Sequence, residues 1–447
     1  RDPIEHQNRM FAAFRAGLGA LAQGGVSIAV ITATMPSSFI KAVGEASNAP
    51  NREAVHIKVG LSEYERSGNG YREICIKDLD FFEERKNLEA LTRFINEADI
   101  LRIVEDHHSC GDNVLIVRNT VKKASETYQQ FKDKSDVNTL LVHGRMTFGD
   151  KKRVLSEARL RICRKKCVLI STQVIEAGVN LDFDVIVTDV SPMANLIQRI
   201  GRVGRRSREQ PKNFYAYLLE GDGDGVYEKD LTTKSIQVLK DISSHQGGEF
   251  YVGWRMPERT IINNRKVPGF ITILENTYHD WNICWDKKLS TTLSEIDRYW
   301  QIDPKYIREY SRVMCSLLRT SGVISLAVLE EDIKTLRNLT ISNLWRQIID
   351  KLVTVDFSWL IRRWRDILDL DFEKGIARYI IIHENGDDVG IYIEESMELF
   401  DLFKDGAYNC TILNKLNQFL KKRSSRSSHP IALKVSKDAY TARGLLT

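Results

Sequence analysis

Residues 167–206 read CVLISTQVIEAGVNLDFDVIVTDVSPMANLIQRIGRVGRR, the most informative part of the chain. This stretch holds two continuous apolar runs, Cys167–Ile170 and Val185–Val187. Apolar runs without polar alternation are typical of strands buried on both faces of a parallel sheet. In such sheets the loops after the carboxyl ends of the strands carry the binding residues. The stretch therefore predicts sheet strands that are followed by functional loops.

The same pattern extends over residues 111–220. Further apolar runs alternate there with amphipathic segments, and this alternation predicts a doubly wound α/β domain with a parallel sheet. The further runs are 114–117, 139–142 and 214–218, and the amphipathic segments include 120–131 and 150–160.

The parts on either side of this domain are less regular. Upstream, we expect strands at 27–31, 54–59 and 72–76, and a helix over 87–104 that connects two lobes. Downstream, residues 221–225 form a Gly/Asp-rich linker, after which we expect a helix-rich region. A hairpin is predicted where residues 377–382 turn near Asn385 into residues 389–393.

Composition places the chain among soluble globular proteins. Its 447 residues carry a net charge of +5, which permits a nucleic-acid partner without requiring one. No apolar stretch is long enough for a membrane helix, so we expect a cytoplasmic protein with no membrane partner. We expect the Cys163/Cys167 pair and Asp106–His108 to be structural rather than metal-binding. We also expect Trp359 and Trp364 to pack in a core rather than to stack on bases.

The end of the opening stretch carries the strongest chemical signal. On a helix, Gln198, Arg202 and Arg205 fall at i, i+4 and i+7, so their side chains would project from one face. Guanidinium groups on such a face can stabilise charge on a transferring phosphoryl group. We therefore expect the two arginine side chains to reach beyond their own domain, near residues 172–180. The alternative is a basic, solvated helix.

Two glycines argue against that alternative. Gly201 and Gly204 would each weaken an ordinary surface helix by about 1 kcal/mol relative to alanine. Their presence predicts a close approach to another backbone or to a ligand. Residues 171–184 are a second signal, because hydroxyl side chains at the end of a strand can contact a phosphate and Gly178 lets backbone come close to a ligand.

These motifs, in this order, resemble those of superfamily 2 helicases. Thr32-Ala33-Thr34 resembles motif III, Asn119-Thr120 resembles motif IV, and residues 141–145 resemble the adjoining motif. Residues 171–184 resemble motif V, and residues 198–205 resemble motif VI. Within the superfamily, motifs V and VI are most similar to the CRISPR-associated helicase of type I interference, and the resemblance covers roughly residues 27–220. It implies a RecA-like fold.

The resemblance also implies roles for individual residues. Arg202 and Arg205, with Gln198, would act on a bound triphosphate, and Thr32 and Thr34 would couple nucleotide state to lobe movement. The nucleotide itself would lie near Gly178, Asn180 and Asp182, where asparagine at position 180 departs from the more common aspartate. The residues expected at a nucleic-acid strand are Asn119, Thr120, His143, Arg145, Thr172 and Gln173.

The implied cofactors are ATP and Mg²⁺, and the implied partners are single-stranded DNA, a CRISPR interference complex and a nuclease domain or subunit. The chain contains no G-x-x-x-x-G-K-[ST] loop, and no Asp-Glu pair ends a strand before motif III. We therefore expect that both cofactors need a first lobe that this chain lacks, and that the chain alone does not hydrolyse ATP. The alternatives are an RNA helicase of the same superfamily and a non-catalytic nucleic-acid-binding module.

The expected organisation has five parts. Residues 1–45 would end the first RecA-like lobe, 46–110 would connect the lobes, and 111–225 would form the second lobe. Residues 226–345 would be a helical linker, and 346–447 a C-terminal accessory domain.

Overall fold

The computed structural model describes about two thirds of the chain in detail. The described residues are 18–19, 21–22, 25, 27–32, 35–47, 54–60, 62–68, 71–79, 90–165, 167–176, 179–204, 214–246, 249–254, 256–257, 260–262, 265–279, 323–329, 348–385, 388–404, 416, 418–419, 424, 428–441 and 443–445. The chain divides into two compact units. The first unit comprises residues 1–140 and 159–310, and the second comprises residues 141–158 and 311–447.

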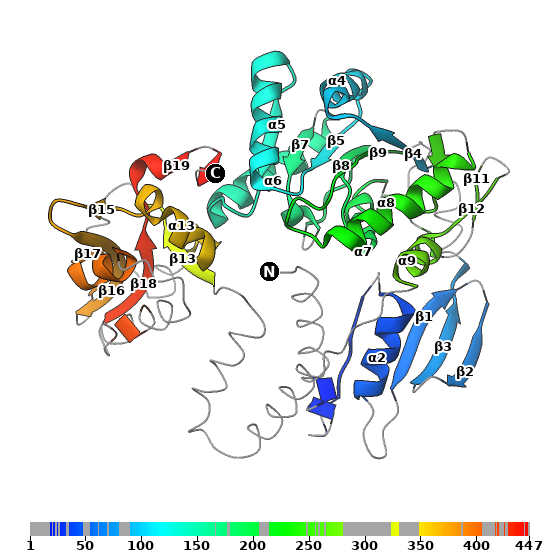
Figure 1. The fold of residues 1–447 in the computed structure, drawn as a ribbon, viewed down its shortest axis with the longest axis horizontal. Helices are drawn as coiled ribbons and strands as arrows, with labels where there is room; N and C mark the ends of the chain where they lie inside the picture. Colours follow the sequence, from blue (N-terminus) through cyan, green and yellow to red (C-terminus); the bar gives the residue numbers. More distant parts are fainter. Residues whose placement is uncertain are drawn as a thin grey trace. The chain divides into compact units, whose positions relative to one another are not determined.

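A seven-stranded sheet forms the centre of the first unit (Figure 1). Its strand order is β10-β4-β9-β8-β5-β7-β6, and strands β4, β9, β8, β5 and β7 are parallel to their neighbours in this series. The strands are β4 (Ala90–Ile95), β5 (Val114–Val117), β6 (Thr139–Val142), β7 (Val168–Ser171), β8 (Val185–Asp189), β9 (Phe214–Leu219) and β10 (Glu249–Tyr251). Every residue of β5, β7 and β8 is buried, as their continuous apolar character predicted.

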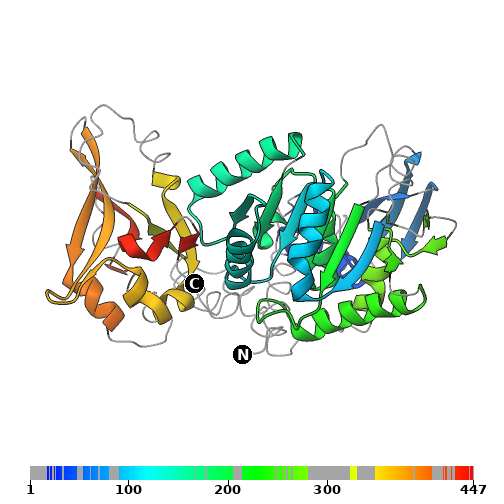
Figure 2. The ribbon, with the colours of Figure 1, turned by 90° about the horizontal axis from the view of Figure 1, so that it is seen from above.

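Helices connect the parallel strands, and the predicted RecA-like α/β fold is confirmed (Figure 2). They are α4 (Ile100–Ser109), α5 (Val121–Lys134), α6 (Phe148–Cys163) and α7 (Met193–Ile200), and two further helices, α8 (Lys229–Ser244) and α9 (Phe270–Tyr278), come after β9 in the chain. The Thr120 side chain accepts a hydrogen bond from the backbone N–H of Lys123 at 3.1 Å and so caps the start of α5.

Two predictions for the upstream part are wrong. Residues 27–31 form no strand, and the Ile31 side chain is 97% exposed. The expected helix over 87–104 is instead strand β4 followed by α4, because residues 90–95 pair with β9 along their whole length. Tertiary pairing here overrides a helical pattern of apolar residues. A separate three-stranded sheet and a helix precede them: α2 (Ser37–Ser47), β1 (Val55–Gly60), β2 (Tyr64–Gly68) and β3 (Tyr71–Lys77).

The Gly/Asp segment after β9 is packed against the sheet domain. Gly223 and Gly225 both have positive φ, which a tight turn requires. Asp224 forms an ion pair with Lys123 at 2.6 Å, so the turn is attached to α5. The first unit continues beyond it through α8 and β10 and then through β11 (Thr260–Ile262), β12 (Arg265–Val267) and α9. The segment 221–225 is therefore not a spacer at the edge of the domain.

The second unit contains a six-stranded sheet. Its strands are β13 (Val323–Ala327), β14 (Leu352–Asp356), β15 (Leu370–Asp371), β16 (Ile376–Asn385), β17 (Asp388–Ser396) and β18 (Ser428–Lys434), followed by the small pair β19 (Tyr440–Thr441) and β20 (Gly444–Leu445). The pairing of β16 with β17 confirms the predicted hairpin. The prediction of a helix-rich region is wrong for the described residues beyond 322, where strands predominate.

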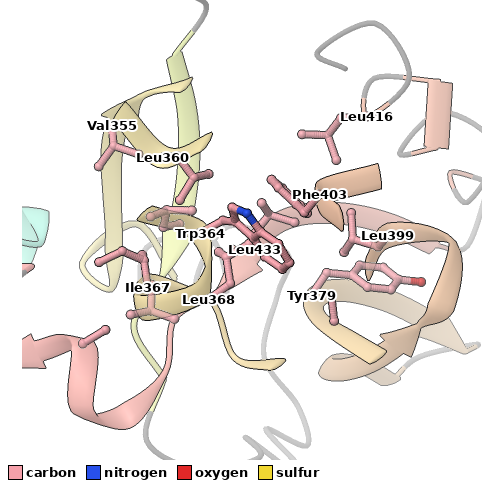
Figure 3. Packing of buried hydrophobic residues seen from close by; sticks show 14 of the residues in the cluster. Val355, Leu360, Trp364, Ile367, Leu368, Tyr379, Leu399, Phe403, Leu416 and Leu433 are labelled. Atoms are coloured by element: carbon pink, nitrogen blue, oxygen red, sulfur yellow. The ribbon is translucent and has the colours of Figure 1, made fainter. Parts of the chain in front are cut away.

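An apolar core fills the second unit between this sheet and helices α13 (Phe357–Ile367) and α14 (Met397–Lys404) (Figure 3). Trp364 stacks on Phe403 with ring centroids 5.8 Å apart, and Tyr379 packs edge-on against Phe419. The expectation that Trp364 packs in a core is confirmed, and Trp359 lies partly buried at the edge of the same cluster. No helix within the described ranges is long and apolar enough to cross a membrane.

Candidate functional site

Polar residues follow three neighbouring strands at the same edge of the main sheet. Val117 at the end of β5 is in register with Ser171 of β7 and Thr188 of β8. Because parallel strands end on the same side, the residues after each strand meet there. These residues are Arg118 and Asn119 after β5, Thr172 after β7, and Asp189 at the end of β8.

Arg199 of α7 lies at the centre of this edge and is fully buried. Its Nη1 donates to the Asn119 Oδ1 at 3.0 Å, to the Asp189 carbonyl at 2.9 Å and to the Thr188 hydroxyl at 3.2 Å. A buried guanidinium costs free energy unless its N–H groups are satisfied and its charge is paired. These contacts satisfy one side of the group.

The carboxylate of Glu176 pairs with the other side of Arg199. Arg199 Nε donates to Glu176 Oε1 at 2.8 Å, and Arg199 Nη2 donates to the Tyr227 hydroxyl, also at 2.8 Å. Tyr227 in turn donates to Glu176 Oε1 at 3.1 Å, and Asn195 donates to Glu176 Oε2 at 3.0 Å. Burial raises the pKa of Tyr227 to about 12, so its hydroxyl keeps the proton that it donates. Arg199 thus joins the loop after β7 to helix α7.

A second buried arginine anchors the loop after β5. Arg118 donates from Nε to Asp189 at 3.2 Å, and Nη1 and Nη2 donate to the two carboxylate oxygens of Glu97 at 2.7 and 3.0 Å. Burial opposes the charge on Arg118, but Asp189 and Glu97 outweigh this effect and raise its pKa. Asp189 also accepts from the backbone N–H of Asn119 at 2.8 Å. The two arginines therefore share Asp189 and Asn119 in one buried network.

Arg199 and Arg118 were not among the predicted site residues. The apolar residues Met193, Leu196 and Ile200 form the inner face of α7, and Arg199 lies on that same face three residues after Leu196. An arginine on the inner face of an amphipathic helix is the signal that could have identified it. For Arg118, the charge directly after a buried strand was the equivalent signal.

The predicted arrangement of Arg202 is wrong in two respects. Helix α7 ends at Ile200, so Gln198 and Arg202 are not one turn apart on a continuous helix. The Arg202 guanidinium donates to the backbone carbonyls of Glu176 and Val179, and the residue is only 7% exposed. Arg202 is thus buried against its own domain, although it lies beside residues 172–180 as expected. Arg205 lies outside the described residues, and Gln198 is exposed on α7.

The two glycines explain where the helix stops. Gly201 is the C-cap of α7, and a Cβ there would lie 3.1 Å from the Ile197 carbonyl oxygen. Gly204 has φ +59°, and its N–H donates to the Phe183 carbonyl at 2.9 Å while Val203 bridges to Phe183. The prediction of a close approach to another backbone is confirmed for Gly204.

Four residues predicted to contact nucleic acid lie around this network. Asn119 is a correction: its side chain is buried and donates to the Val190 carbonyl at 3.1 Å while it accepts from Arg199, so it organises the loop from within. Thr172 is 2% exposed. Thr120 is partly exposed at the start of α5, and Gln173 is partly exposed while its Nε2 donates to the Asn119 carbonyl at 2.6 Å.

His143 and Arg145 belong to the second unit. His143 is a further correction, because its ring is fully buried. Its Nε2 donates to the Arg443 carbonyl at 2.7 Å, and its Nδ1 accepts from the backbone N–H of Arg145 at 3.2 Å. These two bonds fix a neutral ring and leave no site for a second proton. The Arg145 side chain is half-buried and lies over the ring of Trp359 at 4.3 Å.

The environment of His143 makes stability depend on pH. Burial, together with the charges of Arg145 and Lys151, lowers the pKa of His143 to about 4. The unfolded chain takes up this proton near pH 6.5, so stability is complete above that pH and falls as the pH decreases toward 4, by about 3 kcal/mol for this group. Urea denaturation at pH 7.5 and pH 5 should show about 2 kcal/mol of this loss, because the folded group is still mostly unprotonated at pH 5. In His143→Gln the contribution should vanish; an unchanged pH dependence would contradict the assignment.

The remaining predicted residues are placed as follows. Asn180 and Asp182 lie on the segment that precedes β8. Asn180 is exposed, and Asp182 is 7% exposed. Thr32 is exposed on an irregular segment, and Thr34 and Gly178 lie outside the described residues. Among the predicted structural residues, both ring nitrogens of His107 are engaged, with Asp112 and with the Tyr217 hydroxyl, each at 2.8 Å.

The fit of ATP and Mg²⁺ can be judged from the described side chains. No group of three His, Cys, Asp or Glu residues that could hold a metal ion occurs among them. Arg202, the described candidate for a triphosphate, is bonded to backbone carbonyls. The described side chains therefore do not fit a nucleotide–magnesium complex by themselves.

Comparisons with known proteins find similarity in this region. Residues 110–208 match the family described as "CRISPR-associated nuclease/helicase Cas3, C-terminal". A nuclease/helicase Cas3 of Methanothermobacter thermautotrophicus is 42% identical over 134 residues, which are 29% of this chain and 16% of the relative. This region is therefore similar to the C-terminal part of Cas3 proteins. The resemblance stated from motifs V and VI is confirmed.

Other Cas3 relatives extend the match. The helicase Cas3 of Thermoproteus tenax is 27% identical over 246 residues, which are 54% of this chain and 36% of that protein. A solved structure titled "Crystal structure of CRISPR-associated protein" has a TM-score of 0.57 at 16% identity and covers 88% of this chain and 50% of its own. At this identity the structural match shows a shared fold. The chain spans half or less of the length of each of these relatives.

Proposed function

We propose that this chain forms the second RecA-like lobe and accessory part of an ATP-dependent helicase that moves along single-stranded DNA in CRISPR interference. The observation that carries the proposal is the buried network around Arg199, which joins the loops after β5, β7 and β8 to helix α7. In a motor lobe, residues that face the nucleotide and residues that face the strand must move together. A hydrogen-bonded network that is buried around Arg199 supports such coupling.

We base the proposed nucleotide contacts of this lobe on the resemblance of residues 171–184 and 198–205 to motifs V and VI. We propose that Gly178, Asn180 and Asp182 lie near the ribose and that Arg205 approaches the triphosphate. Bound ATP would supply the free energy for lobe closure, and Thr32 and Thr34 would couple that closure to the first lobe. Because the 447 residues contain no phosphate-binding G-x-x-x-x-G-K-[ST] loop, we infer that this chain alone does not turn over ATP.

We propose that the nucleic-acid strand contacts partly exposed residues next to the network around Arg199. Thr120 and Gln173 flank Asn119 on two adjacent loops. Their hydroxyl and amide groups suit phosphate contacts, which position a strand without reading its sequence. We propose that the intact protein works in the cytoplasm with a CRISPR interference complex and a nuclease domain or subunit, because the family's relatives are named nuclease/helicases.

The test compares ATP turnover in two preparations: this chain, and the intact protein that includes a first lobe with a phosphate-binding loop. Each is measured with no nucleic acid, with oligothymidylate and with oligouridylate. We expect no turnover by this chain, and turnover by the intact protein that oligothymidylate stimulates more than oligouridylate. Stronger stimulation by oligouridylate would identify an RNA helicase. No turnover by the intact protein would identify a non-catalytic binding module and refute the motor.

A further inference from the structure

The loop that follows β6 is fixed by the last residues of the second unit. The Leu445 N–H donates to the Arg145 carbonyl at 3.0 Å, and the Tyr440 hydroxyl accepts from the Thr147 N–H at 2.8 Å. Gly444 packs so closely that an added Cβ would lie 2.7 Å from both the Arg145 carbonyl oxygen and the His143 ring. The backbone of Arg145 therefore has one position, and its side chain is presented from a rigid base.

The Arg145 side chain extends over helix α13. Its guanidinium carbon lies 4.3 Å from the centroid of the Trp359 ring. Stacking of this kind holds the planar group by its face and leaves the N–H groups at its edge available. Arg363 lies one turn after Trp359 on the same face of α13, and its side chain is half-buried. One arginine thus stacks on the Trp359 ring, and a second lies one helical turn further along α13.

A third cation lies in the same region. Lys151, in the first turns of α6, is half-buried, and its charge acts on His143 together with that of Arg145. Burial lowers the pKa of Lys151, and burial followed by the charge of Arg363 lowers the pKa of Arg145 to about 10. The charge of Arg363 therefore acts on Arg145 as that of a like-charged neighbour.

No carboxylate among the described residues pairs with these three cations. Asp150 is the acidic neighbour of Lys151, but its carboxylate accepts hydrogen bonds from Arg153 at 2.9 Å, from the Thr147 hydroxyl at 3.0 Å and from Tyr440 at 2.7 Å. Half-buried like charges held together without a counter-ion destabilise the folded protein. Such an arrangement is favourable when an anion occupies it.

We propose that Arg145, Lys151 and Arg363, arranged around Trp359, form a binding site for the phosphate backbone of a single-stranded nucleic acid. The fork of Arg145 suits a phosphate oxygen pair, and cations beside a partly buried aromatic ring occur in single-strand grooves. This inference rests on the proposed function and adds a strand contact on helix α13, outside residues 110–208 that match the family.

The test measures binding of fluorescein-labelled oligothymidylate to this chain by anisotropy over a range of salt concentrations. Arg363→Gln should weaken binding about tenfold, as for loss of one charge-assisted contact, and should reduce the slope of log K against log salt by about 0.7. Arg145→Gln should have a similar effect. Arg362→Gln is the matched control, since it removes the same charge from the adjacent, exposed position of α13 and should leave affinity near wild type.

Three outcomes would overturn the site. Equal affinity of Arg363→Gln and Arg362→Gln would exclude α13 while leaving the helicase proposal intact. Binding of pyrophosphate that depends on Arg363, with unchanged oligothymidylate binding, would assign the site to a small anion. No strand binding by the unaltered chain would overturn both this site and the strand contacts of the proposed function. Thermal denaturation without ligand gives a second readout. Arg363→Gln should melt at the same or a higher temperature, because the repulsion between Arg363 and Arg145 is relieved. A lower melting temperature would also contradict the site.

Discussion

Replacement of Arg199 by alanine is expected to destabilise the first unit by about 3–5 kcal/mol, the range found when one partner of a buried ion pair is removed. The change leaves Glu176, whose side chain is 9% exposed, without its cationic partner. It also removes a donor from Asn119 and from the Asp189 carbonyl, both of which are buried. These groups follow or end strands β5, β7 and β8. Without Arg199 they would be unpaired, which would destabilise the edge of the sheet where the residues that resemble motifs IV, V and VI meet.

Hydrogen exchange measured on peptides from β5, β7 and β8 reports on this edge specifically. In Arg199→Ala these amides should exchange with a correspondingly lower opening free energy. Gln198→Ala is the matched control, because the neighbouring residue on α7 is exposed and its loss should change the opening free energy by less than about 0.5 kcal/mol. Equal protection in both variants would show that the network around Arg199 does not stabilise the lobe.

Replacement of Arg205 by alanine in the intact protein is expected to abolish strand-stimulated ATP hydrolysis. Motif VI offers three arginines: Arg199 is held in the buried network, and Arg202 donates to the carbonyls of Glu176 and Val179. We therefore assign the triphosphate contact to Arg205. Arginine fingers contribute factors of about 10³–10⁵ to phosphoryl transfer, because a guanidinium stabilises charge that develops on the transferring group. The loss should be of that order.

Binding of the strand should be nearly unchanged in the same variant, because the proposed strand contacts lie on other loops. Arg206→Ala provides a control with the same loss of charge at the adjacent position. A similar loss of turnover in Arg206→Ala would indicate a general effect of positive charge rather than a directed contact.

The sequence was sufficient to predict the central strands and the order of the motifs. Strand β5 has the predicted bounds, and β7, β8 and β9 differ from prediction by one or two residues. Strands buried on both faces have continuous apolar runs, which few other structures share. The family followed from the same region, since motifs V and VI are local in sequence.

Features that depend on distant residues were not predictable in this way. Residues 90–95 become a strand only because β9 and β10 pair with them on both sides. The partners of Arg199 come from residues between 119 and 227, and no spacing along the chain brings them together. The end of α7 at Ile200 depends on the bridge from Val203 to Phe183. Each error arose where tertiary contacts override a local pattern.

The central claim is that the region around motifs V and VI is half of an ATP-driven motor. The most direct measurement is ATP turnover and oligothymidylate binding on the same preparations of the intact protein, unaltered and with Arg205→Ala. The account predicts that the unaltered protein hydrolyses ATP when the strand is added, and that Arg205→Ala binds the strand equally well but no longer responds to it. Equal loss of binding and turnover, or turnover that survives the substitution, would contradict it.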